Sequence, residues 1–320
     1  MKALVTGATG FIGSHLVEEL VGQGYYVTCL VRGDSDLKWI ENYPVKKILG
    51  DCLKHEILHK LTDEFDYVFH LAGLTKAANT NDFYSTNATG TENLIKNVIK
   101  YNKNVKRFVY ISSLAVGGPS MDGVPLCPCS PPNPVSEYGR SKLQGEEAVI
   151  RQSDEIPVTI IRPPAVYGPR DRDFYMLFKM VKRGYLPYWG KSFYSFIYVE
   201  DLARGIANSV KTEKTIGKTY YLTDTETYSN EFLTDTIASE LKCKYIKLRI
   251  PKSAIPFIAN IIQKLTKTSI INSDKMTELK HTHWTCNCED AVNDFSFKPE
   301  VTLREGIKWT ANWYRLHKWL

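Results

Sequence analysis

The sequence predicts an α/β fold, in which a doubly wound parallel sheet is followed by a smaller α/β domain. Short apolar runs alternate with longer helical patterns through the first half of the chain, which is typical of βαβ units. A glycine-rich turn joins the first apolar run to the first helical pattern. The chain has 320 residues, 43% of them hydrophobic, which suffices for one large domain and a smaller second one.

The apolar runs of the first half predict the strands of the large sheet: Lys2–Thr6, Tyr26–Val31, Val45–Leu49, Tyr67–Leu71, Arg107–Ser112 and Val158–Arg162. Helical patterns fill the gaps between them, at Phe11–Gly22, Leu53–Thr62, Phe83–Tyr101 and Ser136–Gln152. A doubly wound sheet binds its ligand at the carboxyl ends of its strands. We therefore expect the functional residues to follow these runs directly.

The second half of the chain shows a weaker alternation after Arg162. It predicts short strands and a final amphipathic helix: Phe196–Val199, Thr219–Leu222, Tyr245–Leu248 and the helix Leu303–Leu316. We assign residues 1–165 to a nucleotide-binding domain and 166–320 mainly to a substrate domain. Residues 194–212 are expected to return to the first domain, with Phe196–Val199 in the large sheet. Prolines between Gly117 and Pro134 predict a long loop at the functional end of that sheet.

The glycine turn has the spacing Gly7-x-x-Gly10-x-x-Gly13. The first glycine lets the strand turn sharply, the second lets backbone N–H groups approach phosphates, and the third lets the helix pack close to the sheet. The positive end of the helix dipole then faces the anion. The turn predicts a Rossmann-type site for a dinucleotide pyrophosphate, formed by Gly7, Thr9, Gly10, Phe11, Ile12 and Gly13.

Composition and charge exclude several other classes of protein. The net charge of +6 is not concentrated in a Lys/Arg block, so it suits an anionic cofactor but does not favour nucleic acid. Met1 and Lys2 lead directly into the first strand, which predicts a cytoplasmic protein without a leader. The apolar stretch Ala254–Ile262 is too short to span a membrane. For 254–265 we expect packing against the large domain, rather than an apolar lip over the substrate or contact with a membrane surface.

The cysteines predict neither a disulfide framework nor a metal site. They are odd in number, seven in all, and Cys29 falls in a buried strand. The Cys127-Pro-Cys129 pair lacks the two-residue spacer of redox or zinc turns, so we assign it no role. His281, His283, Cys286 and Cys288 lie close in sequence, but side chains two residues apart point in opposite directions on a strand. We therefore expect no bound metal.

A tyrosine and a lysine one helical turn apart can place an ammonium beside a phenol. The spacing Tyr-x-x-x-Lys occurs at Tyr138/Lys142 and also at Tyr43/Lys47, Tyr175/Lys179 and Tyr314/Lys318. Only Tyr138 and Lys142 begin a predicted helix that follows both a strand ending in Ser112-Ser113 and the proline-rich loop. We therefore take Tyr138 and Lys142 as the candidate catalytic pair.

With this pair in place, the chain resembles the extended short-chain dehydrogenase/reductases over nearly its whole length. The residues that carry the resemblance are Gly7, Gly10, Gly13, Gly50-Asp51, His70-Leu71-Ala72-Gly73, Asn87, Ser113, Tyr138, Lys142, Arg162-Pro163-Pro164 and Tyr198 to Ala203. The resemblance implies that Tyr138 exchanges the proton while hydride passes between nicotinamide and substrate. It also implies that Lys142 holds the ribose, that Ser113 binds the developing alkoxide and that Asn87 supports the site. The remaining cofactor contacts are expected from Asp51, Cys52, Leu71, Ala72, Gly73, Pro163 and Val166.

The end of the second strand bears on the choice between NAD and NADP. A carboxylate there accepts the ribose hydroxyls of NAD, whereas a cation meets the extra phosphate of NADP. This chain has Val31 followed by Arg32. We therefore expect NADP, with NAD as the alternative.

The substrate class is read from residues that differ among branches of the family. In the family that this chain resembles, nucleotide-sugar dehydratases and decarboxylases carry an acidic residue at the position of Leu114-Ala115. Sugar epimerases of the family usually have Asn at the position of Ala165. Arg162-Pro163-Pro164 is similar to the dihydroflavonol reductase and 3β-hydroxysteroid dehydrogenase branch, which implies an oxidoreductase acting on a hydrophobic ketone or alcohol. Candidate substrate contacts are Thr75, Lys76, Tyr167 and Arg170.

Two other functions stay open at this point. The first is a nucleotide-sugar epimerase that keeps its cofactor bound, since Arg170, Arg172 and Lys191 could hold an anionic group. The second is a catalytically inert NADP-binding regulator, against which the retained Tyr138 and Lys142 argue. The resemblance also implies a homodimer that pairs through the helices predicted at Phe83–Tyr101 and Ser136–Gln152.

Overall fold

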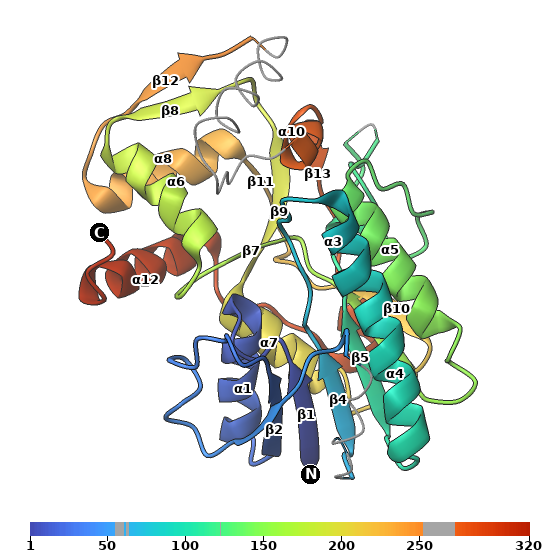
Figure 1. Ribbon diagram of the computed structural model, residues 1–320. Helices are drawn as coiled ribbons and strands as arrows, with labels where there is room; N and C mark the ends of the chain where they lie inside the picture. Colours follow the sequence, from blue (N-terminus) through green and yellow to red (C-terminus); the bar gives the residue numbers. More distant parts are fainter. Residues whose placement is uncertain (55–60, 62–63, 122, 252–272) are drawn as a thin grey trace.

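The larger part of the molecule is a seven-stranded sheet, with strand order β10-β6-β5-β4-β1-β2-β3 and parallel pairing throughout (Figure 1). The computed structural model describes residues 1–54, 61, 64–121, 123–251 and 273–320. The strands of this sheet are β1 Lys2–Thr6, β2 Tyr26–Val31, β3 Lys46–Leu49, β4 Tyr67–His70, β5 Arg107–Ile111, β6 Val158–Arg162 and β10 Lys218–Tyr221. The fold class predicted from the sequence is confirmed.

Helices cover both faces of this sheet, because successive residues of a strand point to opposite sides. Leu4 packs in a core with Leu94 of one helix, whereas the next residue, Val5, packs in a second core with Leu16 of another. The helices of the first face are α4 (Gly90–Tyr101) and α5 (Glu137–Ile150), and those of the second are α1 (Phe11–Gly22), α7 (Val199–Asn208) and α11 (Glu289–Phe295). Two such cores require strands that carry apolar side chains on both faces of the sheet.

A buried ion pair fastens α5 to the sheet. The Arg162 guanidinium donates two hydrogen bonds to the Glu146 carboxylate, at 2.8 and 2.6 Å, and both side chains are almost fully buried. Arg162 ends β6, and Glu146 lies on the inner face of α5. The bidentate geometry fixes the rotation of α5 relative to the sheet.

The smaller part of the molecule carries two short sheets. One contains β7 (Ala165–Tyr167), β9 (Phe193–Tyr198), β11 (Thr227–Ser229) and β13 (His283–Trp284), and the other pairs β8 (Tyr185–Tyr188) with β12 (Ile246–Arg249). The helices around them are α6 (Arg172–Lys182), α8 (Asn230–Leu241), α10 (Ser273–Leu279) and α12 (Leu303–Leu316). Aromatic side chains such as Tyr167, Phe178 and Tyr314 fill their common core.

The division of the chain between the two parts differs from the expected one. The sequence analysis places Phe196–Val199 in the large sheet, but β9 pairs with β7, β11 and β13 in the small one. The helix that follows, α7, packs on the large sheet, against α1, and Ile197 of β9 contacts the same core. The edge strand beyond β6 is instead β10, which sequence analysis assigned to the second domain. Pattern alone cannot assign these short runs, because both sheets bury apolar strands.

The helix predicted over Phe83–Tyr101 consists of three pieces. It begins earlier, as α3 (Thr80–Tyr84), continues through a π-helical turn at Ser85–Thr89 and ends as α4. The π turn contains the buried Asn87, whose side chain bonds to the backbone of Leu74. A π turn inserts one residue into the helix and so re-aims a side chain, which is a common device at functional sites.

The cysteine pattern predicts no disulfides, and this prediction is wrong for one pair of cysteines. Cys127 and Cys129 are joined by a disulfide, with their Cα atoms 5.2 Å apart. The Cys127 carbonyl accepts a hydrogen bond from the Ser130 N–H at 2.9 Å, so a tight turn brings the two sulfur atoms together. The other cysteines, all in the described part of the chain, are free thiols.

Two predictions fall largely on residues outside the described ones. They are the helix at Leu53–Thr62 and the packing of residues 254–265 against the large domain. Within the described ranges, the structure contains no helix with the length and apolar character needed to cross a bilayer.

Candidate active site

The glycine turn after β1 brings three backbone segments into close contact. Gly7 has φ +69°, and a Cβ on it would lie 2.7 Å from the backbone N of Ala72. A Cβ on Gly13 would lie 2.0 Å from the Gly7 carbonyl oxygen. Gly10 caps the N-terminus of α1, and its own N–H donates to Gly7 O at 3.0 Å. The result is an exposed helix N-terminus beside the loop that follows β4, which is the geometry that binds a dinucleotide pyrophosphate.

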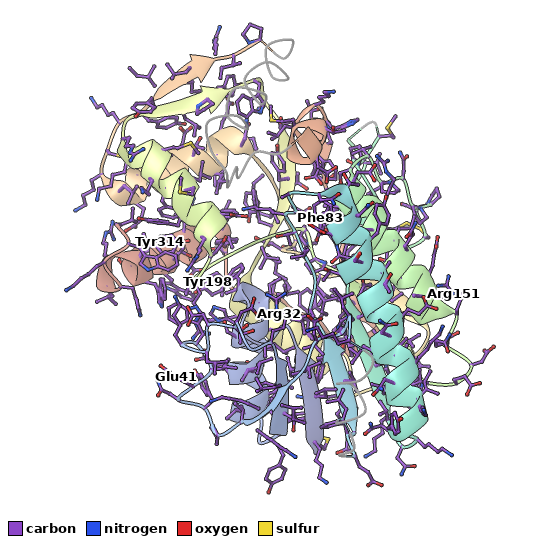
Figure 2. All side chains as sticks on the ribbon, viewed as in Figure 1. Arg32, Glu41, Phe83, Arg151, Tyr198 and Tyr314 are labelled. Atoms are coloured by element: carbon purple, nitrogen blue, oxygen red, sulfur yellow. A yellow bond between two sulfur atoms is a disulfide. The ribbon has the colours of Figure 1, made fainter. Side chains whose placement is uncertain are left out.

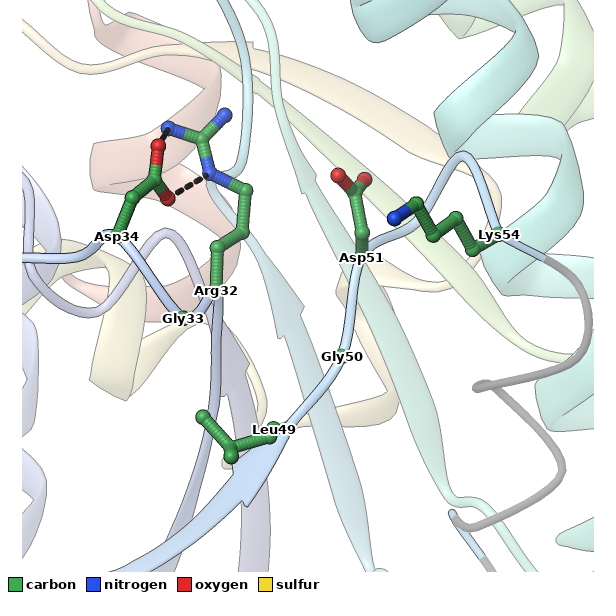
Figure 3. Close-up of a pocket in the computed structure, with 7 residues that line it drawn as sticks. All are labelled: Arg32, Gly33, Asp34, Leu49, Gly50, Asp51 and Lys54. Carbon is green, nitrogen blue, oxygen red and sulfur yellow. Dashed lines mark hydrogen bonds and ion pairs between the residues drawn. The ribbon is translucent and has the colours of Figure 1, made fainter.

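A cavity of about 440 Å³ lies beside this turn at the ends of β2 and β3 (Figure 3). Its lining includes Arg32, Asp34 and Asp51. The Arg32 guanidinium bonds to Asp34, at 3.1 Å from Nε to Oδ1, and both side chains are more than half exposed. Asp51 accepts the N–H of Leu53 at 2.9 Å. Lys54 also lines the cavity, which thus offers two cations and two carboxylates where the adenosine half of a dinucleotide would lie.

The first turn of α5 is held by side chains from two elements. Ser136 caps the helix by accepting the Gly139 N–H at 3.1 Å. Asp274 of α10 accepts the N–H groups of Glu137 and Tyr138, at 2.5 and 2.9 Å. These are N–H groups that lack a partner within the helix. The start of α5, which carries Tyr138, is therefore fixed by a helix of the smaller part.

Lys142 lies one turn further along α5, with 4% of its surface exposed. Its Nζ donates to the Ile111 carbonyl at 2.6 Å and lies 4.2 Å from the centre of the Tyr110 ring. Burial lowers the pKa of Lys142 to about 7, and the nearby Glu146 charge opposes this shift. The ammonium is thus held by a backbone carbonyl and an aromatic face on the inner side of the site.

Tyr138 packs its ring on Phe83, with the ring centres 6.0 Å apart. Phe83 lies on α3 and is labelled in Figure 2. Burial raises the pKa of Tyr138 to about 12, a hydrogen bond with Ser113 lowers it, and the negative charge of Glu278 raises it. The phenol is therefore protonated at neutral pH. It can act as an acid toward a bound oxygen.

A chain of hydrogen bonds connects the nucleotide turn to Asn87. The Ala72 N–H donates to the Thr6 hydroxyl at 3.2 Å, which lies 2.6 Å from His70 Nδ1. On its other side, His70 Nε2 lies 2.9 Å from the Thr91 hydroxyl, which donates to Asn87 O. Because Thr91 uses its proton on that carbonyl, His70 must donate from Nε2 and accept at Nδ1. Burial lowers the pKa of His70 to about 3, so the ring is neutral.

Asn87 and Gly73 meet Lys142 at the base of the site. The Asn87 amide bonds to both backbone groups of Leu74 and donates to the Ser141 hydroxyl at 2.9 Å. A Cβ on Gly73 would lie 2.9 Å from Asn87 Oδ1 and 3.8 Å from Lys142 Nζ. Asn87 therefore ties the loop after β4 to α5.

A second cavity, of about 190 Å³, opens between Tyr138 and the smaller part of the molecule. Its lining is Ser113, Leu114, Ala115, Tyr138, Pro164, Ala165, Tyr194, Ser195, Glu278, Leu279 and Trp284. Ser113 and Tyr138 are the hydroxyl groups that the sequence analysis selected for the substrate oxygen. Ser112, the preceding residue, is buried outside this lining.

The other predicted cofactor residues belong to the lining of neither cavity. Thr9, Phe11 and Ile12 are partly exposed at the start of α1. The Pro163 carbonyl accepts the Leu114 N–H at 2.8 Å, and Val166 and Leu71 pack on the core beside α1. The Cys52 carbonyl accepts the Asn93 amide at 3.2 Å.

The predicted substrate residues lie outside the lining of the second cavity. Lys76 forms an ion pair with Asp173, and Thr75 is exposed beside it. Arg170 pairs with Glu18 at 2.8 Å and lies over the Trp39 ring. Tyr167 is almost fully buried in the core of the smaller part. None of these four side chains therefore reaches the cavity that holds Tyr138 in this structure.

Sequence reasoning missed the residues that the smaller part adds to the site. Asp274 and Glu278 on α10, Tyr194 on β9 and Trp284 on β13 border Tyr138 or its helix. Two residues of the possible metal site that the sequence analysis discounted make other contacts. His283 stacks on Phe193, and Cys286 is buried beside Ser195. No local pattern marks Asp274 or Glu278, because their partners lie some 140 residues earlier in the chain.

Comparisons with known proteins place this site in a family. The model of the NAD dependent epimerase/dehydratase family matches residues 3–222. The chain is 30% identical to the ceramide reductase of Caulobacter vibrioides, covering 99% of this chain and 95% of the relative. It is 25% identical to the human sterol-4-alpha-carboxylate 3-dehydrogenase, decarboxylating, covering 98% and 88%.

The fold recurs in solved structures. That of the UDP-glucuronic acid 4-epimerase from Bacillus cereus, in complex with NAD, superposes with a TM-score of 0.80 at 24% identity, covering 99% of both chains. The matched family model spans the glycine turn, Ser113, Tyr138 and Lys142, and the relatives cover nearly the whole chain. The chain belongs to the NAD dependent epimerase/dehydratase family.

Proposed function

We propose that the protein is an NADP-dependent oxidoreductase that interconverts a hydrophobic ketone and the corresponding secondary alcohol, with Tyr138 as acid and base. The observation that carries this proposal is the cavity in which Ser113 and Tyr138 lie together among mostly apolar walls. Both hydroxyls can contact one substrate oxygen there, and Lys142 lies one helical turn behind Tyr138.

The residues of this chain supply the proton transfer and the orientation. A bound nicotinamide nucleotide supplies the hydride equivalent that the reaction exchanges with the substrate carbon. Tyr138 is protonated at neutral pH, since burial raises its pKa to about 12, and it gives its proton to the substrate oxygen during reduction. Ser113 donates a hydrogen bond to the same oxygen and stabilises the charge that develops on it. The Lys142 amine is held at the Ile111 carbonyl, one helical turn behind the phenol, and in its protonated form it favours the phenolate.

The nucleotide fits the first cavity and the glycine turn. Gly7 and Gly13 leave no room for a side chain, so backbone N–H groups at the start of α1 are open to a pyrophosphate. Arg32 would meet the 2′-phosphate of NADP, and Asp51 the adenine amino group.

The preference for NADP is tested by replacing the cation. Arg32→Ala should weaken NADPH binding by about tenfold or more and leave NADH binding within about threefold, because a charge-assisted phosphate contact contributes roughly 1.5–3 kcal/mol. Fluorescence titration of both nucleotides measures this. Equal losses for NADPH and NADH would contradict the assignment.

The apolar walls support a hydrophobic substrate. Leu114, Ala115 and Ala165 line the cavity, at positions where dehydratases and epimerases of the family usually carry an acid or Asn. Two similar relatives carry the names of enzymes for lipids, a ceramide reductase and a sterol-carboxylate dehydrogenase. The missing Asn and the apolar lining favour the oxidoreductase over the epimerase.

The epimerase is the second candidate, because an epimerase is among the structures that superpose on the whole chain. The two functions differ in one observable. A ketone reductase changes the nicotinamide absorbance at 340 nm with each turnover, in proportion to product, at about one nucleotide per substrate. An epimerase isomerises a UDP-sugar with no net change in absorbance, and an inert regulator binds NADPH without either effect.

The test of Tyr138 is its replacement by phenylalanine. Tyr138→Phe should leave NADPH affinity within about threefold and reduce turnover by two or more orders of magnitude, the range for losing an acid/base group. Tyr43→Phe, in another Tyr-x-x-x-Lys pair of the chain, is the matched control and should keep turnover within about twofold of the unaltered protein. Unchanged turnover in Tyr138→Phe would refute the proposal.

A further inference from the structure

The disulfide between Cys127 and Cys129 has no part in the proposed reaction, and it closes a very short loop. The two cysteines are two residues apart in the sequence. In the chain-entropy account, the stability that a disulfide contributes grows with the length of the loop it closes, so this bond contributes little. The loop is fixed just before the disulfide, because the Leu126 N–H donates to Thr285 O and its carbonyl accepts the Asn287 N–H, both at 2.9 Å.

The two cysteines of this bond differ in their surroundings. Cys127 follows the fixed Leu126, is only partly exposed, and its N–H donates to the Ser130 hydroxyl at 3.2 Å. Cys129 is exposed. A thiolate that opens a disulfide must reach one of its sulfur atoms directly, so access decides which sulfur is attacked. The more exposed residue, Cys129, is therefore the point of attack.

Ser130 can stabilise the sulfur that leaves. Its hydroxyl oxygen lies 3.5 Å from Cys127 Sγ. A sulfur atom in a disulfide carries no hydrogen, so the Ser130 hydroxyl is the donor in this contact. A thiolate accepts such a hydrogen bond more strongly than a disulfide sulfur does, because it carries a negative charge. The Ser130 hydroxyl therefore favours departure of Cys127 as a thiolate.

We propose that Cys127 and Cys129 form a thiol–disulfide exchange site for small thiols, with Cys129 as the sulfur attacked and Cys127 as the sulfur that leaves. The incoming thiolate forms a bond with Cys129 Sγ, and the bond between the two protein sulfurs breaks. Its electron pair goes to Cys127 Sγ, beside the Ser130 hydroxyl. This exchange needs neither the nucleotide nor the ketone, so it can be tested independently of the proposed function.

A second thiol molecule completes the exchange. Its thiolate attacks the sulfur that the first thiol brought into the mixed disulfide, and Cys129 leaves as a thiolate. The protons of the two incoming thiols end on Cys127 and Cys129. Two small thiols have then been oxidised to one disulfide, and the protein disulfide has been reduced to two thiols.

The first test measures the opening of the bond by glutathione. The purified chain is incubated with a large excess of reduced over oxidised glutathione, its thiols are blocked with N-ethylmaleimide, and the peptide with Cys127 and Cys129 is analysed by mass spectrometry. We expect the bond to be open in at least about 90% of molecules, because exposed disulfides exchange readily whereas structural ones resist glutathione. A bond that stays closed would overturn the inference.

Thermal unfolding in the same buffers separates an exchange site from a structural disulfide. Opening should lower Tm by no more than about 2 °C, because the closed loop is short. The double variant Cys127→Ser, Cys129→Ser is the matched control, and its Tm should not depend on the glutathione ratio. A larger loss of Tm in the unaltered protein than in this control, beyond about 2 °C, would show a structural bond instead.

The direction of attack is tested by stopping the reaction early. Fragmentation of the trapped peptide should place glutathione on Cys129 and N-ethylmaleimide on Cys127 in at least about nine of ten mixed disulfides. Ser130→Ala should slow the opening about threefold or more, because the leaving thiolate loses a hydrogen bond. Ser153→Ala, at an exposed turn after α5, is the control and should open at the unaltered rate. Glutathione on Cys127, or equal rates in the two serine variants, would overturn the assignment.

Discussion

Gly13 determines the geometry of the nucleotide turn, because it has no side chain where the backbone comes close to it. Its missing Cβ leaves the Gly7 carbonyl free to approach the first turn of α1. The same approach keeps the helix N-terminus close to β1 and the loop after β4, so the anion site depends on it. Gly22 ends the same helix with nothing within 4 Å of its Cβ position, and it carries no such constraint.

Gly13→Ala should therefore weaken NADPH binding by about tenfold or more and destabilise the protein by about 1–3 kcal/mol, the usual effect of overpacking. Urea unfolding and fluorescence titration measure the two effects. Gly22→Ala is the control in the same helix and should be neutral or stabilising by up to about 1 kcal/mol, because alanine is the better helix former. Similar behaviour of the two variants would contradict this account of the turn.

At the scale of elements, the catalytic helix depends on a helix of the other part of the molecule. Asp274 on α10 accepts the first two N–H groups of α5, while Ser136 accepts the third. A carboxylate at this end also interacts favourably with the helix dipole. The phenol of Tyr138 therefore keeps its place relative to Ser113 only while α10 is docked.

Asp274→Ala should lower kcat by about tenfold, with a smaller change in KM, and cost about 1 kcal/mol of stability, as for the loss of an N-cap. Asp274→Asn keeps one acceptor and should recover most of kcat. Steady-state kinetics and thermal unfolding check both effects, with Asp36→Ala, an exposed acid paired with Lys38, as the control. A normal kcat in Asp274→Ala would show that the cap does not position Tyr138.

Among the described residues of the whole molecule, two histidines are buried and neutral, and both lie in the larger part. The Nε2–H of His15 donates to the Pro169 carbonyl at 3.0 Å, and burial lowers the pKa of His15 to about 4. His70 lies between Thr6 and Thr91 with a pKa of about 3. In the unfolded chain both rings take up a proton near pH 6.5. Between these values the unfolded state binds more protons, so stability falls as the pH falls.

Lowering the pH from 7 to 5 should thus reduce the free energy of unfolding by roughly 2 kcal/mol for each of these histidines. Urea unfolding at the two pH values measures the loss. In His15→Gln, the part of this loss of stability that comes from His15 and His70 should be about half as large. His317→Gln changes an exposed histidine and should leave the loss unchanged. A loss of stability that is the same in His15→Gln and the unaltered protein would contradict this origin.

Much of the larger part could be predicted from the sequence, because its signals are local. The pattern at Phe11–Gly22 gives α1 with its observed bounds, and in the smaller part the pattern at Leu303–Leu316 gives α12. The position of Tyr138 after a serine-ended strand sufficed to select Tyr138 and Ser113, which line one cavity. Pairing of two copies through α4 and α5 stays a prediction.

Features that depend on distant contacts could not be predicted. In the π turn at Ser85–Thr89, the Asn87 side chain is bonded to Leu74. The hydrophobic periodicity of the segment does not predict this turn. Glu278 reaches Ser136 across the chain, from a short helix without a motif. Arg170 was proposed as a contact for an anionic group because of its charge, but charged groups also find partners such as Glu18 at the surface.

The path of the chain between the two sheets has a practical consequence. After β6 the chain passes to β7 and β9 in the smaller part and then to α7 and β10 in the larger part. It next passes through the smaller part again and reaches the larger part once more at α11. A fragment cut after residue 165 would thus lose the outer strand beside β6 and the helices that shield one face of the nucleotide sheet. Neither half can be excised as a self-sufficient module, so swapping specificity between relatives calls for grafting individual segments, α10 foremost.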